Sequence, residues 1–499
     1  MMESVDTEPD FSISTNIHEM EKLWASELYE LSAQDRENTN NELHGVTTSE
    51  IHSNPEDGWT EDQYLTCLDL FQTEIDTKIP FEDKQTYRRG LELGSSYIMS
   101  PTFRIGFLRA ERFDVQKAAI RYCNCLDFLA EFFGEFALMR PLLMSDLTKR
   151  ESKFLKEGFV QVLPNRDRLG RRILAQLGSY GGDRFTELEK FRVNVYLCFT
   201  VLAQDVTTQR LGVVSLGSFG RGAEQCLRDE VRTISNLIKR FFAAIPLRWS
   251  AAHLCIPNDP LFHVVKALVL FLIGQNGRRK LRIHIGTPVE CDYALRSFGI
   301  PTEDIPRTFT HTIKTKNHVR LIKVRKVIDG FVEKAAGTNK DFRFPGIECP
   351  EINCVLFGKY AWDHPGNIEF RGLLREVLND KWLDLDISDQ MDSMIEEVID
   401  KSRAREFHFL VYNRETFLYA EVADDEAMRV LADQALKEYR KRRRAKRMIA
   451  ETKLIITNVA DGEDRNNTRG SSNLSSLRRD MGGKKFLKDC NGCRCFAIE

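Results

Sequence analysis

The sequence of 499 residues predicts an α/β protein, in which a helical N-terminal lobe precedes a mainly parallel sheet with covering helices. Two patterns lead to this class. Apolar residues recur at helical spacing in residues 113–138, and short apolar strands alternate with helical segments in residues 160–286. Because strands separated by helices of about ten or more residues form parallel crossovers, the middle of the chain is expected to be one helix-covered sheet. A small α+β domain and disordered termini complete the predicted architecture.

The composition is ordinary for a globular protein, with 42% hydrophobic residues, 29% charged residues and a net charge of −2. No run of about 18 apolar residues is present, so we do not expect the protein to be an integral membrane protein. The N-terminus has neither the basic nor the apolar region of a secretory signal peptide. The twelve cysteines are mostly scattered, which suits a reducing compartment, and a cytoplasmic location is therefore expected.

The near-zero net charge hides a gradient along the chain. Residues 1–60 contain fourteen acidic and two basic residues with few large apolar ones, which predicts a disordered arm. Residues 437–499 contain seventeen basic and eight acidic residues. The predicted organisation is an acidic disordered arm at 1–60, a helical lobe at 61–160, a sheet domain at 161–330, a small α+β domain at 345–448 and a basic disordered tail at 449–499.

Local signals place individual elements. Asp114 is the predicted N-cap of an amphipathic helix, and a turn at Asp167–Arg171 separates the first two strands. A further helix is predicted at 223–243. The strands are predicted at 158–164, 171–177, 210–216, 251–256 and 280–286.

One helical segment, PLFHVVKALVLFLIG from Pro260, is apolar on nearly every face. Such a helix must be buried on all sides or must face something apolar that is not protein. Two interpretations stay open, a core helix and a lid over a lipid-sized cavity. The candidate lining or gate residues are Leu261, Phe262, Val265, Leu268, Val269, Phe271 and Leu272.

Residues 100–310 contain the string FLRAERFDVQKA and, further on, a turn with Asp167, Gly170 and Arg171. On these motifs this part of the chain resembles the CRAL-TRIO family of lipid carriers, whose helical lobe and hairpin turn have similar signatures. RLGVVSLGSFG, PLRWSAAHLCIPNDPLF and GRRKLRIHIGTPVECDYALRSFGIP follow in the family's order. The resemblance implies a lipid-sized apolar cavity with a gating helix. It also implies a non-enzymatic protein whose partners are a hydrophobic small molecule or phospholipid and, transiently, a membrane surface.

Residues 353–374 resemble the opening of a domain of unknown function that is common in diatoms. Many fixed residues of its pattern N-x-V-L-F-G, H-P-G-N and F-R fall in this short span. From the residues alone, Pro365 and Gly366 predict a turn and Asn367 a helix cap, while a ligand-contacting loop is the alternative. The matching motif residues are Asn353, Val355, Leu356, Phe357, Gly358, His364, Pro365, Gly366, Asn367, Phe370 and Arg371.

Catalytic motifs are not recognised. Gly217, Gly220 and Gly222 form neither a dinucleotide fingerprint nor a Walker loop, and no nucleophile elbow is present. The histidines of the sheet domain lack paired metal-ligand spacing. We therefore predict no catalytic residues, no metal and no cofactor.

The C-terminal region offers two further signals. Cys490, Cys493 and Cys495 are candidate acylation sites beside basic residues, with inert thiols and metal binding as the alternatives. A basic cluster has three interpretations: a solvated helix face, a nuclear localisation or nucleic-acid patch, and a contact with acidic lipid. It consists of Arg440, Lys441, Arg442, Arg443, Arg444, Lys446 and Arg447.

Two functions from different classes follow. The first is binding, with intermembrane transfer, of a hydrophobic ligand or phospholipid by a cytoplasmic protein that associates peripherally with membranes. The second is a nuclear or cytosolic regulatory protein, in which the C-terminal domain and the basic cluster bind protein or nucleic acid. Nucleic acid is the less favoured of these partners. The sequence does not determine the oligomeric state.

Overall fold

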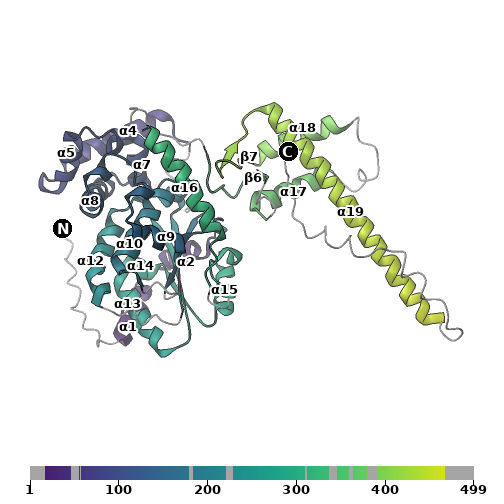
Figure 1. The fold of residues 1–499 in the computed structure, drawn as a ribbon, viewed down its shortest axis with the longest axis horizontal. Coiled ribbons are helices and arrows are strands. Elements are labelled where there is room, and N and C mark those ends of the chain that lie inside the picture. The colour runs from purple at the N-terminus through teal and green to yellow at the C-terminus, as the bar shows by residue number, and fades with distance from the viewer. Residues whose placement is uncertain are drawn as a thin grey trace. The chain divides into compact units, whose positions relative to one another are not determined.

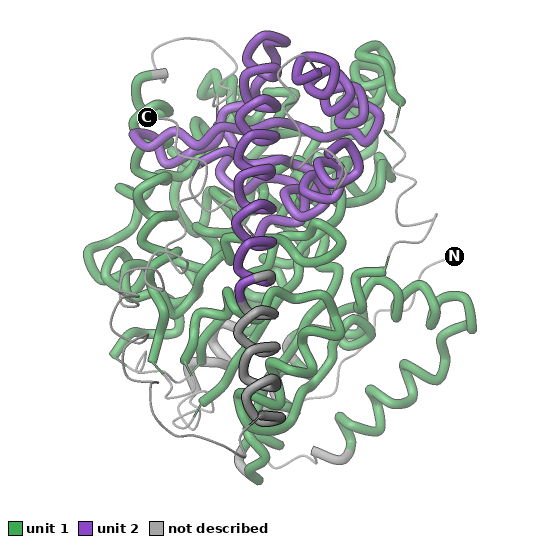
Figure 2. Tube along the Cα trace, turned by 90° about the vertical axis from the view of Figure 1, so that its right-hand side faces the viewer, with its two compact units in different colours: residues 1–344 green, residues 345–499 purple. Residues whose placement is uncertain are grey.

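The computed structural model describes residues 17–46, 56, 58–178, 184–220, 229–308, 312–335, 346–358, 363–378 and 390–466. The chain divides into two compact units, residues 1–344 and 345–499 (Figures 1 and 2). In the described residues, unit 1 contains the helical lobe and a five-stranded sheet, and unit 2 contains a three-stranded sheet with three helices. The α/β class predicted from the sequence is confirmed.

The helical lobe packs around Tyr122, whose ring contacts those of Phe71, Tyr87, Phe103 and Phe107. The predicted amphipathic helix is α8, and its N-cap is Asp114, which accepts a hydrogen bond from the backbone N–H of Lys117. The helices are α4 (Glu61–Thr77), α5 (Gln85–Glu92), α6 (Ser96–Met99), α7 (Pro101–Ala110), α8 (Val115–Phe133) and α9 (Lys149–Glu157).

The five predicted strands of unit 1 are all present and form one mixed sheet in the order β1-β2-β3-β4-β5. The first pair is an antiparallel hairpin and the remaining pairs are parallel. The strands are β1 (Val160–Val162), β2 (Arg172–Gly178), β3 (Val213–Phe219), β4 (Trp249–Ile256) and β5 (Leu281–Ile285).

The strand order decides where the helices lie. Because neighbouring parallel strands follow one another in the chain, right-handed crossovers place the connecting helices on one face of the sheet. The other face must be covered by chain outside the crossovers, and α15 (Pro288–Ser297) supplies part of the cover. The crossover helices are α10 (Glu187–Leu197), α11 (Val206–Leu211), α12 (Asp229–Ala244), α13 (Pro260–Leu272) and α14 (Gly274–Arg279).

The acidic arm supplies the rest of the cover, so the prediction that residues 1–60 are disordered is wrong for the part that the structure describes. Two helices form there, α1 (Ile17–Tyr29) and α2 (Ala33–His44). Leu43 is fully buried against the sheet face shared with α15, and Met20 is buried against α13. Few apolar anchors are enough because the sheet already presents an apolar surface for the helices to cover.

Glu56 is a second ordered point in the same arm. Its buried side chain contacts Arg109 at 3.0 Å and Arg210 at 2.6 Å, and it accepts a hydrogen bond from the hydroxyl of Tyr64. Burial by itself raises the pKa of Glu56, but the two guanidinium groups outweigh it and hold the pKa below its ordinary value. This acidic residue of the arm therefore forms ion pairs with basic groups of the folded domain.

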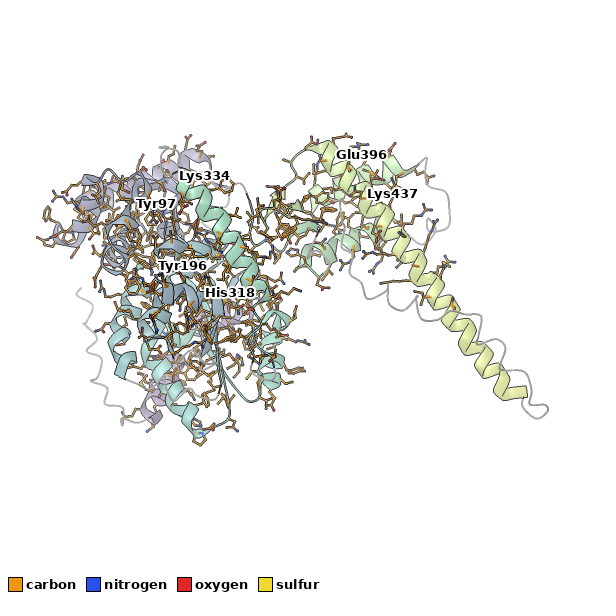
Figure 3. The ribbon with its side chains drawn as sticks, viewed as in Figure 1. Tyr97, Tyr196, His318, Lys334, Glu396 and Lys437 are labelled. Atoms are coloured by element: carbon orange, nitrogen blue, oxygen red, sulfur yellow. The ribbon has the colours of Figure 1, made fainter. Side chains whose placement is uncertain are left out.

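α16 (Lys316–Ala335) closes unit 1 against the helical lobe. His318 at its start is buried, and its Nε2 lies 2.5 Å from the carbonyl oxygen of Leu155 in α9 (Figure 3). Further along, Arg325 donates to the carbonyl oxygen of Thr200 and pairs with Asp329. These contacts hold α16, the last helix described in the unit, against Leu155 of α9 and against Thr200.

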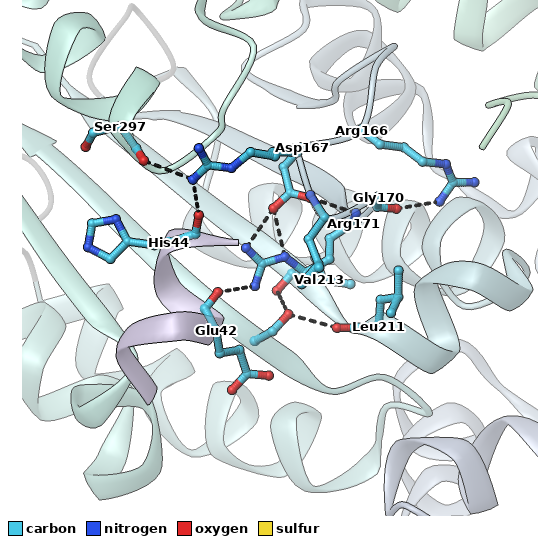
Figure 4. Close-up of polar contacts among 12 residues, drawn as sticks. Glu42, His44, Arg166, Asp167, Gly170, Arg171, Leu211, Val213 and Ser297 are labelled. Carbon is cyan, nitrogen blue, oxygen red and sulfur yellow. Dashed lines mark hydrogen bonds and ion pairs between the residues drawn. The ribbon is translucent and has the colours of Figure 1, made fainter. Parts of the chain in front are cut away.

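The turn between β1 and β2 is held by a buried ion pair (Figure 4). Oδ2 of Asp167 lies 2.7 Å from Nη2 of Arg171, and Oδ1 accepts the backbone N–H groups of Leu169 and Arg171. Nη1 of Arg171 donates to the carbonyl oxygen of Glu42 in α2 at 2.6 Å. The hairpin motif noted in the sequence thus joins the sheet to the acidic arm.

Unit 2 is the predicted small α+β domain. In its sheet, β6 and β7 are parallel and β7 and β8 antiparallel. The prediction of a disordered tail from residue 449 is wrong up to Asn466, because the last helix continues to that residue. The elements are β6 (Cys354–Phe357), α17 (Pro365–Val377), α18 (Met391–Ala404), β7 (His408–Tyr412), β8 (Tyr419–Glu421) and α19 (Asp425–Asn466).

We predict that Asp167→Asn lowers the free energy of unfolding of unit 1 by about 3 kcal/mol, because it leaves the buried Arg171 guanidinium without its counter-charge. Urea denaturation followed by tryptophan fluorescence measures the change. Glu92→Gln, which neutralises the carboxylate of an exposed pair with Arg89, serves as the matched control and should cost less than about 0.5 kcal/mol. Equal losses in the two variants would contradict the role given to Asp167.

Candidate functional site

α13 is the apolar helix singled out in the sequence, and it lies over the C-terminal half of β4. Phe262 and Leu270 are buried among Leu254 and Ile256 of that strand. Of the predicted lining residues, Val269 and Phe271 are partly buried in the same cluster. The side chains of Leu261, Val265, Leu268 and Leu272 fall outside the described residues, so their roles stay predictions.

The sheet face beneath α12 and α13, here called the α13 face, is incompletely covered. Along β3, Val213 is buried at the start of the strand, whereas Ser215, Gly217 and Phe219 are partly exposed. The register continues this row onto the neighbouring strands, since Gly217 pairs with Gln176 of β2 and Ser215 with Ala252 of β4. Gln176, Ala252 and Ile283 are also partly exposed.

The opposite face is filled. Val214 and Leu216 of β3 and Ala251 of β4 are at most 1% exposed, against Leu43 of α2 and Leu295 of α15. Helices cover both faces of the central strand, yet only one face retains accessible surface. Accessible surface on a central strand requires room for a water-sized sphere beside the side chains. The α13 face is therefore where unit 1 has space next to its sheet.

The chemistry of the α13 face is mainly apolar. Its strands contribute small residues, Ser215, Gly217 and Ala252, which leave room, and Phe219 and Ile283, which supply apolar surface. α13 adds the partly buried apolar side chains of Val269 and Phe271. Leu237, Ile238 and Phe242 of α12 pack against the core that includes the helical lobe.

Polar groups at the α13 face are few. Gln176 and Ser215 stand on its strands, and the Lys239 ammonium group lies 5.3 Å from the ring centroid of Phe271. A surface of this kind can bind hydrocarbon and orient it through one or two polar contacts.

The filled face contains a histidine pair. Nδ1 of His253 lies 3.1 Å from Nε2 of His284, and both rings contact Phe298 edge-on. Burial lowers the pKa of His284 to about 4, with a further contribution from Arg282, and burial also lowers that of His253 far below its ordinary value. Both imidazoles are neutral near pH 7, so one ring can donate and the other accept.

The H-P-G-N motif of unit 2 is structural. Asn367 does not cap a helix as predicted, because α17 already begins at Pro365 with His364 as N-cap. Its buried side-chain amide instead accepts from the N–H of Leu356 at 2.8 Å and donates to the carbonyl of that residue at 2.9 Å. A Cβ atom at Gly366 would lie 2.1 Å from the carbonyl oxygen of Cys354. The motif thus fastens α17 to β6 at close range.

The remaining motif residues surround this junction. Gly358 has a φ of +105°, and Asn353 donates to the carbonyl oxygen of Glu406 beside β7. Phe357 and Phe370 each place their ring against Phe409 of β7. These contacts are all made within unit 2, and those of the three phenylalanines lie in its core, so they favour the structural interpretation of the motif over the ligand loop.

Arg371 lies on α17, where burial lowers its pKa and the carboxylate of Asp363 opposes that change. Arg442 of α19 is close enough to add to the lowering. The motif arginine therefore faces the start of the basic cluster within unit 2.

The basic cluster lies on α19, past its packed part. Leu436 is fully buried in the core of unit 2 and Tyr439 packs against that core, whereas Lys441, Arg444 and Lys446 are exposed. Arg442 pairs with Glu438 one turn earlier at 2.7 Å. The cluster lies on a helix that continues past the core, as the first interpretation expects, and the choice among the three interpretations stays a prediction.

Other predicted sites receive less support from the structure. Cys490, Cys493 and Cys495 lie outside the described residues. The eight cysteines that are described are buried, and no disulfide joins them. Among the described residues, no cluster of three or more His, Cys, Asp or Glu side chains could hold a metal ion. The helices found in that same part of the chain include none with the length and apolarity needed to cross a membrane.

Comparison with known proteins gives no assignment: no protein-family model matches the chain, and a search of curated proteins finds no match. The geometry of the two units therefore carries the functional argument.

Sequence reasoning missed the residues of the α13 face. The signal was present in RLGVVSLGSFG, where the small Ser215 and Gly217 flank the larger Leu216. A strand with small residues on one face and branched residues on the other points to space on the first face. The carboxylates of α1 and α2 were also missed, because they were read as the charges of a disordered arm.

Acidification should weaken unit 1 through His284. The pKa of His284 is about 6.5 in the unfolded chain and about 4 in the folded one. Between these pH values the unfolded state therefore binds more protons than the folded state does. The free energy of unfolding should fall by about 1–3 kcal/mol as the pH drops from about 6.5 to 4.

The His284→Asn variant tests this origin. It should lack this part of the pH dependence when urea denaturation is repeated across the range, whereas His408→Asn, at an exposed histidine, should retain it. Identical pH profiles for wild type and His284→Asn would contradict the assignment.

Gly366→Ala should destabilise unit 2 by at least about 2 kcal/mol, because the new methyl group collides with the backbone of Cys354. Hydrogen exchange of β6 and α17 measures the loss. Gly372→Ala in the same helix is the matched control. A methyl group there meets nothing within 4 Å, so the substitution should be neutral or stabilise by about 0.5–1 kcal/mol.

Proposed function

We propose that unit 1 binds a hydrophobic ligand with acyl chains between the α13 face of the sheet and helices α12 and α13. The observation that supports this most directly is the one-sided exposure of the central strand. Ser215, Gly217 and Phe219 keep accessible surface beneath covering helices, while Val214 and Leu216 on the reverse side have almost none. The similarity to CRAL-TRIO lipid carriers points in the same direction.

The free energy gained by burying hydrocarbon favours such a ligand. Each methylene group that leaves water for an apolar surface contributes about 0.8 kcal/mol, so a lipid chain gains from every small residue that leaves room for it. Phe219, Ile283 and Phe271 offer that apolar surface. Gln176 and Ser215 are polar groups that can fix one end of the ligand.

α13 is the element that can give access to this space. It packs on β4 through Phe262, Ala267 and Leu270 on one side, and its remaining positions are also largely apolar. When it moves outward, the same residues can lie against the hydrocarbon of a bilayer. We therefore propose a non-enzymatic carrier that exchanges its ligand at a membrane surface. The alternative of a nuclear or cytosolic regulator rests on the basic part of α19 and stays a prediction.

Native mass spectrometry of the full-length protein, followed by lipid extraction, tests the proposal. A co-purifying lipid, together with transfer of a fluorescent phosphatidylcholine between vesicles, is the expected result. Absence of both would overturn it.

Ala252→Phe should reduce the retained lipid and the transfer rate about tenfold or more. Its ring would occupy the volume of two or more methylene groups, each worth about 0.8 kcal/mol. Ser215→Leu is a milder second variant at a neighbouring position, and a melting curve for each shows that the domain is folded. Thr73→Phe, which adds the same ring on the exposed side of α4, should behave as wild type. Full lipid occupancy in folded Ala252→Phe would place the ligand elsewhere.

A further inference from the structure

α1 covers the proposed gate. Met20 is buried and Trp24 partly buried in the cluster formed by α13 and β4, and Nε1 of Trp24 donates to the carbonyl oxygen of Arg278 in α14 at 2.8 Å. In the fold, α1 lies beside α13 and α14 (Figure 1). An outward movement of α13 therefore requires α1 to leave first.

The cover is fastened by carboxylates on basic groups of the domain. Glu21 lies 2.6 Å from Nζ of Lys266 on α13. Glu27 receives two hydrogen bonds from Arg278, at 2.7 and 2.5 Å, and both side chains are less than 10% exposed. Opposite charges thus hold α1 directly on the helix that must move and on the one after it.

α2 repeats this arrangement at the other end of the strands. Glu42 pairs with Arg248, which precedes β4, and lies 3.4 Å from Lys280, which precedes β5. These groups compensate the burial of Glu42, and its pKa remains below the ordinary value. Arg248 in turn lowers the pKa of Arg112, so positive charge around this one carboxylate is in excess.

Removal of α1 would therefore uncover a surface with two properties. It would carry the basic groups of Lys266 and Arg278 beside the apolar residues that Met20 and Trp24 now cover. Basic groups around an apolar patch fit the anionic headgroups and the hydrocarbon of a bilayer. α1 is 13 residues long, a length at which an isolated helix is only marginally stable in water.

We propose that α1 forms an autoinhibitory strap, in which Glu21 and Glu27 occupy the positions that anionic lipid headgroups take on a membrane, while α2 stays packed on the opposite face of the sheet. An anionic bilayer competes for the same cations, displaces the strap and frees α13. This inference rests on the proposed function, because it describes how access to the α13 face is controlled. The strap keeps the gate closed away from membranes and lets a negatively charged leaflet open it.

Vesicle co-sedimentation of the full chain tests the strap. Glu21→Gln combined with Glu27→Gln should bind phosphatidylcholine vesicles that contain phosphatidylserine at least about tenfold more tightly than wild type, since two cations are released toward the anionic surface. The gain should shrink with added salt and be small on pure phosphatidylcholine. Hydrogen exchange in α1 should rise in parallel.

Two control variants separate the causes. Glu30→Gln combined with Glu37→Gln removes the same charge from exposed positions directly after α1 and in α2, and it should bind as wild type. Lys266→Gln combined with Arg278→Gln also loosens the strap but removes the docking cations, so binding should not increase. Increased binding by this cation variant, or no increase by the glutamate variant although α1 exchanges faster, would overturn the proposal.

The failure of the strap and the failure of the proposed function give different results. Lipid found by native mass spectrometry in every variant, with unchanged vesicle binding, overturns only the strap. Salt-sensitive vesicle binding by the glutamate variant, with no lipid in any sample and no transfer, supports the strap as a membrane-docking switch and overturns the carrier function.

Discussion

The constraint on which unit 1 depends is that its sheet has parallel strands in chain order. Right-handed crossovers then place α10, α12 and α13 on one face and leave the other uncovered. α15 and α2 cover that face, and the Arg171–Asp167 pair joins the hairpin turn to the backbone of Glu42 in α2. A segment of strongly acidic composition is therefore an integral part of the fold.

The same constraint makes the two faces of the sheet unequal. The face covered by α2 and α15 is filled by side chains, including the neutral His253–His284 pair. The face beneath the crossover helices keeps accessible surface at Ser215, Gly217 and Phe219. In the proposed carrier function, the filled face would form a rigid wall and the less filled face an adaptable one. α13, held from outside by α1, is the adaptable part.

Much of the fold could be predicted from the sequence because its signals are local. Apolar periodicity, the Asp114 cap and the alternation of strands and helices correctly predicted α8, the five strands and the small α+β unit. The H-P-G-N motif was correctly located, but its mechanism was misjudged. Asn367 pairs with Leu356 across a close helix–strand contact, and such contacts between distant segments leave no local pattern.

The sequence by itself determined the α/β fold class, the number of strands in the main sheet and the unusual apolarity of α13. These features follow from the hydrophobic pattern along the chain. Only the tertiary structure decided that part of the acidic arm folds into helices. Its low hydrophobicity predicts disorder for an isolated chain, but Met20, Leu43 and the carboxylates of α1 and α2 meet apolar and basic groups already arranged by the sheet. Helix formation there is stabilised by surfaces that come from residues more than a hundred positions away. Composition within a window of sixty residues contains no information about those surfaces.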